Sequence, residues 1–159
     1  MKAIADRARR RLERLRNSRG ATLVEAALIT LLLLFLTFAI IDFGSLLYVF
    51  LSLENGVSQA TRYAVTGQQQ AGMTRSQSIM TAMRQATPTL TLPDGAFTFS
   101  FMPPGASTWS NGTGAPDDIG RVQVAYTWDV MTPLIRPFFT NGQITIRVES
   151  SMKNEARWQ

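Results

Sequence analysis

Arg19-Gly20-Ala21-Thr22-Leu23-Val24-Glu25 joins an arginine-rich segment to an apolar run, Ala26 to Ile41, that contains no charged residue. A carboxylate within a membrane-bound segment is costly and by default marks a functional position. The 16 residues of the apolar run would span about 24 Å as a helix, whereas a bilayer's hydrocarbon core is about 30 Å thick. We therefore expect Glu25 to have a function and to lie at a boundary of the membrane.

The apolar character resumes beyond Asp42, and no proline occurs between Ala21 and Gly67. These features predict one continuous helix over residues 21–67, with its first half in a membrane and its second half outside. In the second half, apolar residues recur at the spacing of an amphipathic helix that covers a core. The residues expected to face that core are Leu46, Leu47, Phe50, Leu53, Val57, Ala60 and Ala64. Gly67 is well placed as the C-terminal cap.

The remaining residues, 68–159, predict a small α+β domain. Thr74-Arg75-Ser76-Gln77 has the form of a capping box and opens a short helix that Thr87-Pro88 closes. Apolar and polar residues then alternate over 97–101, 122–130 and 144–148, as in strands with one buried face. A shorter strand is expected at 90–92. The resulting antiparallel sheet of three or four strands should pack its apolar face on the outer half of the long helix.

Charge is concentrated at the start of the chain. Residues 1–20 carry a net charge of +6, and residues 21–159 carry −1. A basic arm can bind nucleic acid, but positive charge beside an apolar run is typical of a membrane protein's cytoplasmic flank. We therefore expect a cytoplasmic N-terminus, a domain on the other side of the membrane, and no nucleic-acid partner.

The composition argues against an enzyme. The chain has no cysteine and no histidine, which excludes disulfides and thiolate metal sites and removes the usual general base. No Ser-x-x-Lys or Gly-x-Ser-x-Gly context supports a nucleophile. We expect no catalytic site, no metal and no cofactor.

Three kinds of export signal are compatible with the N-terminus. A conventional secretory signal would need a cleavage site after a short apolar core, and no Ala-x-Ala site stands in a suitable place. An uncleaved signal anchor fits the charge asymmetry but leaves Glu25 as a mere interfacial charge. The third possibility is cleavage between Gly20 and Ala21, which would place Glu25 fifth in the product, as in type IV prepilins and pseudopilins. The new α-amino group would then be a cation within about a helical turn of Glu25, or of the Glu25 of an adjoining subunit.

Three sequence blocks carry a more extensive resemblance. GATLVEAAL (residues 20–28), IIDFG (40–44) and NGVSQATRYAVTG (55–67) resemble the TadE-like family of pseudopilins. That family belongs to the tight-adherence (Flp-type) pilus machinery of bacteria. Residues 144–155 are also similar to the way such proteins end, whereas residues 73–141 carry no motif that matches.

The resemblance implies a minor pilin-like subunit of the bacterial inner membrane. A prepilin peptidase would remove the basic leader, residues 1–20, and the freed helix would stack with those of other pilins on the membrane assembly platform. The domain after Gly67 argues against the role of major subunit, because major Flp pilins have little beyond the helix. The alternative function is an uncleaved single-pass membrane protein whose outer domain binds a partner or ligand.

Three other features have two interpretations each. Asp42 either lies at the outer membrane surface or pairs with another subunit inside a filament. Trp109, in the long loop 103–120, is a candidate contact for a partner, because long loops in compact domains are often functional. Asp117-Asp118 could contribute to a calcium site, but two acids are too few and an EF-hand pattern is absent.

Overall fold

The computed structural model describes the backbone of residues 2–157 and the side chains of residues 20–157. Two helices, α1 (Lys2–Val65) and α2 (Arg75–Ala86), precede a four-stranded antiparallel sheet. Its strands are β1 (Phe97–Met102), β2 (Ser110–Asn111), β3 (Ile119–Asp129) and β4 (Gln143–Lys153), in the order β2-β1-β3-β4. Short 3₁₀ turns lie at Asp94–Ala96, Arg136–Phe138 and Thr140–Gly142. The predicted α+β fold is confirmed.

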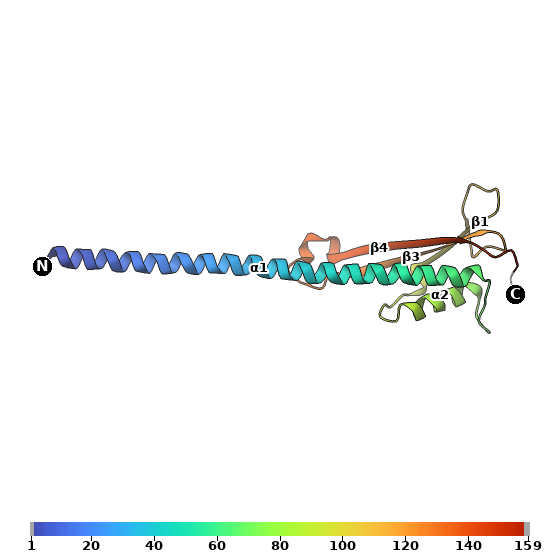
Figure 1. Cartoon of the computed structure of the whole chain (residues 1–159), viewed down its shortest axis with the longest axis horizontal. Helices are drawn as coiled ribbons and strands as arrows, with labels where there is room; N and C mark the ends of the chain where they lie inside the picture. The colour runs from blue at the N-terminus through green and yellow to red at the C-terminus, as the bar shows by residue number, and fades with distance from the viewer. Residues whose placement is uncertain (1, 158–159) are drawn as a thin grey trace.

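The long helix organises the molecule. Its 64 residues correspond to a rod of about 96 Å. In Figure 1 the N-terminal half projects away from everything else, while β3, β4 and α2 lie along the C-terminal half. The helix passes through Gly20 without a break, so the proposed leader continues it, although the side chains of residues 2–19 lie outside those described.

The C-terminal end of α1 is capped by two backbone hydrogen bonds. Gly67 adopts a positive φ of 67° and donates from its backbone N–H to the carbonyl of Ala64 at 3.2 Å, as expected of a capping glycine. The backbone N–H of Glu155, beyond β4, donates to the carbonyl of Val65 at 3.1 Å. Two of the last carbonyls, which have no partner within a helix, are therefore satisfied, one by the capping glycine and one by the domain.

The buried face of α1 is rotated from the one predicted. Leu53, Val57, Ala60 and Ala64 are buried as expected, but Leu47 and Phe50 are exposed. Val49 is buried in their place, with Leu46 packed against the core. The error arose because apolar residues surround the helix between Phe43 and Leu53, so that spacing alone did not fix which side the sheet covers.

Helix α2 begins with the predicted capping box. The Thr74 side chain accepts from the backbone of Gln77, and the Gln77 side chain accepts from the backbone of Thr74. Its buried side, which includes Ile79 and Met83, packs on α1. The two helices approach closely at Gly56, because an added Cβ there would lie 2.5 Å from Cγ2 of Thr87.

The sheet has the predicted alternation, with two corrections. Val122 and Val124 of β3 are buried opposite Ser150 and Val148 of β4, on the side that faces α1. The short strand expected at residues 90–92 is absent from the described chain, because Arg84 holds the Leu92 carbonyl with two donors, at 2.7 and 2.9 Å, in a turn beside α2. The fourth strand is instead β2, two residues inside the loop 103–120.

Candidate functional site

The predicted processing residues, Gly20 and Ala21, lie together with Glu25 on the exposed part of α1, whereas the other predicted assembly residue, Asp42, does not lie with them. Gly20, Ala21 and Glu25 line one shallow hollow with Val24 and Leu28, and all are exposed. Ala21 and Glu25 are four residues apart and therefore neighbours on one side of the helix. Gly20 is open to the side chains that the structure describes, since none of them lies within 4 Å of the position that a Cβ would occupy. The hollow is formed by one helix alone and is open to its surroundings, so a binding site here would need a partner molecule to enclose it.

The apolar part of α1 is not covered by other described parts of the protein. The helix from Gly20 to Val65 is long and apolar enough to cross a membrane, and its most apolar 18-residue window has no residue buried inside the protein. Its exposed large side chains form a continuous surface that a bilayer or other apolar helices could cover. They are Leu23, Val24, Leu28, Ile29, Leu31, Leu32, Leu33, Leu34, Phe35, Leu36, Ile40 and Ile41.

Asp42 has a structural partner that neither interpretation of the sequence included. It is only 5% exposed, and its two carboxylate oxygens bind the start of the loop between β3 and β4. The backbone N–H of Met131 donates to Oδ1 at 3.0 Å, and the hydroxyl of Thr132 donates to Oδ2. Asp42 therefore fastens this loop to α1 within one subunit, where the outer domain meets the apolar half of the helix.

Trp109 is 38% exposed and lies on the sheet rather than extending into solvent. Its ring stacks over the Arg121 guanidinium at 4.0 Å, and Arg121 also donates from Nε to Oγ of Ser100 at 2.9 Å. One face of the indole is therefore already used to hold the loop 103–120 against the sheet. The remaining exposed surface is what a partner would contact.

The neighbouring carboxylates have separate partners. Asp117 pairs with Nζ of Lys153 at 3.0 Å, whereas Oδ2 of Asp118 accepts from the backbone N–H of Ala115 at 2.7 Å. Across the described residues, no three acidic, histidine or cysteine side chains gather in a group that could hold a metal ion. Both acids stabilise the loop in this arrangement.

Arg75 joins the end of α1 to the same loop. Its Nη2 donates to the carbonyl of Ala64 at 2.7 Å and its Nη1 to that of Gly114 at 2.8 Å. Burial lowers the pKa of Arg75, because desolvation disfavours the charged form. The cation stands at the C-terminus of α1, where the helix dipole favours positive charge.

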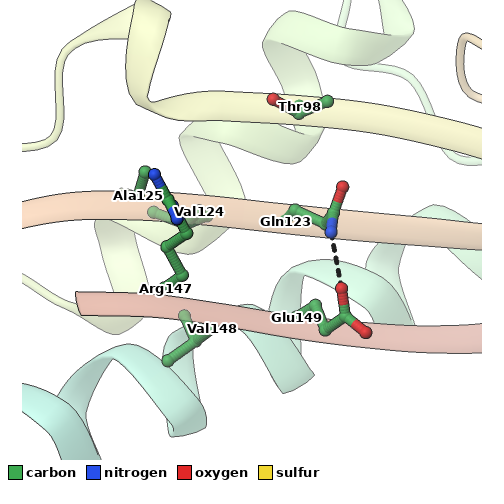
Figure 2. A pocket seen from close by; sticks show the side chains of 7 residues that line it. All are labelled: Thr98, Gln123, Val124, Ala125, Arg147, Val148 and Glu149. Carbon is green, nitrogen blue, oxygen red and sulfur yellow. Dashed lines mark hydrogen bonds between the residues drawn. The ribbon is translucent and has the colours of Figure 1, made fainter. Parts of the chain in front are cut away.

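The outer face of the sheet carries an open hollow of about 390 Å³ with a mixed polar and apolar lining. Figure 2 shows Gln123 and Glu149 joined across β3 and β4, with Nε2 donating to Oε2 at 2.5 Å, and Arg147 lying beside Ala125. Thr98 of β1 completes the rim (Figure 2). These side chains include one acid and one base but neither a histidine nor a cysteine, and they offer a polar surface for contact.

Residues that sequence analysis missed lie in the β3–β4 loop. Phe138 is 73% exposed and meets Phe35 of α1 edge-on, with ring centroids 6.2 Å apart. A signal was present, because Met131, Leu134, Phe138 and Phe139 are unusually apolar for a loop interrupted by two prolines. The contact with α1 joins residues far apart in sequence, so no local pattern could reveal it.

The comparisons with known proteins bear on the same helix. Residues 20–62 match the family model described as TadE-like protein. No curated protein and no solved structure shows significant similarity to the chain. The match begins at Gly20, includes Glu25 and Asp42, and covers the apolar span together with most of the half that packs on the sheet.

A TadE-like segment on an N-terminal apolar helix indicates a membrane-anchored protein related to the tight-adherence pilus. Residues after 62, which form α2 and the sheet, lie outside the match. Residues 20–62 are therefore similar to the TadE-like family, and this similarity covers about a quarter of the chain.

Proposed function

We propose that this chain is a minor pilin-like subunit of a tight-adherence pilus system, cleaved by a prepilin peptidase between Gly20 and Ala21. The observation that carries the proposal is the exposed apolar half of α1. This segment contains Glu25 and lies within the residues that match the TadE-like family model. The helix would reside in the bacterial inner membrane before assembly, with its N-terminus in the cytoplasm and its domain outside. It would then pack among the helices of other pilins on the assembly platform.

The spacing of Ala21 and Glu25 supports an assembly role for Glu25 after cleavage. Removal of residues 1–20 makes Ala21 the new N-terminus, and its α-amino group is largely cationic at neutral pH. Ala21 and Glu25 share a side of the helix, so the cation can pair with its own Glu25 or with that of a neighbouring subunit. Such pairing matters most when the helix enters an apolar bundle, because a lone buried carboxylate is strongly disfavoured.

Cleavage also requires that a peptidase reach the bond between Gly20 and Ala21, and the exposure of this part of α1 is compatible with that. Gly20 is exposed, and no side chain in residues 20–157, the part with described side chains, crowds it. Glycine is among the least favourable residues in a helix interior, by about 1 kcal/mol relative to alanine, so the helix opens more readily there. A peptidase at the cytoplasmic membrane surface could therefore bind residues 19–25 in an extended form.

The test of the assembly role is Glu25→Ala in cells that form the pilus. We expect normal membrane insertion and a loss of incorporation into pili of about tenfold or more, because an unpaired charge in an apolar bundle costs several kcal/mol. The matched control is Glu54→Ala, which removes an exposed carboxylate from the half of α1 that packs on the domain. Normal incorporation of Glu25→Ala would refute this role for the carboxylate.

A further inference from the structure

The loop between β3 and β4 presents a set of exposed apolar side chains, here named the apolar tip. The tip consists of Met131, Leu134, Phe138 and Phe139. No acidic residue occurs between Met131 and Gly142, and Arg136 is the only charged residue there. Apolar groups of this size are rarely left in water without a reason.

The apolar tip lies against the apolar part of α1 rather than against the core. Phe138 contacts Phe35, and together with Leu134 it faces the helix across a groove of about 390 Å³. The helix side of this groove is lined by Leu28, Leu31, Leu32 and Phe35. In Figure 1 the loop, drawn in orange, stands beside the middle of α1 at the end of the sheet nearest the N-terminus.

The position of Phe35 sets the depth of the tip in a membrane. A span that began at Ala21 and stopped before Phe35 would contain 14 residues, about 21 Å, which is too short for a hydrocarbon core of about 30 Å. A span of sufficient length reaches residue 40 or beyond. If α1 crosses the bilayer, Phe35 therefore lies within the hydrocarbon, and Phe138 in contact with it lies at the same depth.

Most backbone donors of the loop are paired within the protein. An unpaired backbone N–H group in hydrocarbon costs several kcal/mol, so this pairing lowers the cost of inserting the tip. Two of the thirteen residues between Val130 and Gly142 are prolines without an N–H group, and seven of the other eleven N–H groups donate to protein acceptors. The seven donors are those of Val130, Met131, Ile135, Arg136, Phe138, Phe139 and Gly142.

The two charged groups near the tip are also accommodated. Asp42 is covered and binds Met131 and Thr132, so its carboxylate does not face lipid unpaired. The side chain of Arg136 folds back over Gly142 at the base of the loop, where its Cδ lies 3.0 Å from the position of an added Cβ. The stem of Arg136 therefore covers the base of the loop while the residue stays exposed, an arrangement compatible with the snorkelling of arginine at membrane surfaces.

We propose that the apolar tip inserts into the hydrocarbon of the membrane leaflet on the domain side, with Asp42 holding the loop against α1. The occupant of the groove is then lipid acyl chain. The tip and the helix would form a two-point attachment that fixes how the domain is oriented on the membrane. This inference requires that α1 cross a bilayer, but it requires neither cleavage at Gly20 nor assembly into a pilus.

The test uses the absence of cysteine, which permits a single fluorescent label. Full-length chain carrying Phe138→Cys, labelled with an environment-sensitive nitrobenzoxadiazole group, is reconstituted into phosphatidylcholine–phosphatidylglycerol vesicles with brominated acyl chains. Leu31→Cys marks the exposed apolar span. Gln68→Cys, exposed beyond the end of α1, which lies about 45 Å along the axis from Phe35, marks the aqueous side.

We expect bromine quenching at position 138 within about twofold of that at position 31, whose depth α1 itself sets, and none at position 68. A second label at Leu134→Cys keeps Phe138 in place and should be quenched similarly. Water-like emission without quenching at both loop positions, with position 31 quenched, would overturn the proposal. Blue-shifted emission without bromine quenching that grows with protein density would show a second copy on the groove, and would equally overturn it.

Discussion

Removal of the Asp42 carboxylate should release the β3–β4 loop while leaving the core folded. In Asp42→Ala, the Met131 N–H and the Thr132 hydroxyl lose their acceptor. A hydrogen bond to a charged group contributes about 1.5–3 kcal/mol, and part of that is recovered when water reaches the released donors. We estimate a loss of about 2–4 kcal/mol, confined to the attachment of the loop to α1.

The appropriate assay is amide hydrogen exchange on the full chain in lipid nanodiscs. Exchange of the Met131 amide should accelerate by about 30- to 1,000-fold, since about 1.4 kcal/mol corresponds to a factor of ten. Amides of Val122 and Val124 in the core should keep their protection, because they lie in the centre of the sheet. Asp42→Asn should give an intermediate effect, since the carboxamide offers one acceptor oxygen instead of two.

Glu54→Ala is the control, because it removes an exposed carboxylate from the same helix. Two results would refute the reasoning. Unchanged exchange at Met131 in Asp42→Ala would mean that the carboxylate does not hold the loop. Equal loss of protection at Met131 and at Val124 would mean that Asp42 supports the whole fold rather than the loop alone.

Three further substitutions test the packing of α1, each by denaturant unfolding in detergent. Gly56→Ala should lower stability by about 1–3 kcal/mol despite alanine's better helix propensity, because its Cβ would collide with Thr87. Gly44→Ala, with open space around it, should raise stability by up to about 1 kcal/mol. Stability changes of the same sign in Gly56→Ala and Gly44→Ala would contradict the packing. Arg75→Lys should lower stability by about 1–2 kcal/mol, because one ammonium cannot replace the guanidinium fork between Ala64 and Gly114, and an unchanged midpoint would argue against that bridge.

Local signals in the sequence predicted most of the fold. The capping box at Thr74, the cap at Gly67 and the alternation in β3 and β4 depend on residues close together in the chain, and all were found where expected. The spacing of apolar residues did not predict which side of α1 is buried, because apolar residues surround the helix just after its apolar span. Burial of Val49 in place of Phe50 depends on where the sheet docks.

The candidate site was predictable only in part. Gly20, Ala21 and Glu25 were identified from their order and spacing, and a regular helix then fixes how they face one another. The contacts of Asp42 with Met131 and Thr132 join residues 89 and 90 positions apart, which no local pattern reveals. The same holds for Phe35 and Phe138, whose meeting depends on the length of the β3–β4 hairpin.

The central claim is that the chain is processed as a prepilin, and the N-terminus of the mature protein tests it most directly. Intact mass and N-terminal peptide analysis should be carried out on protein extracted from native membranes. We predict a chain that begins at Ala21, having lost the segment with a net charge of +6. A chain that still carries Met1 or Lys2, in cells with an active prepilin peptidase, would contradict the claim and leave an uncleaved single-pass anchor with an outer partner- or ligand-binding domain.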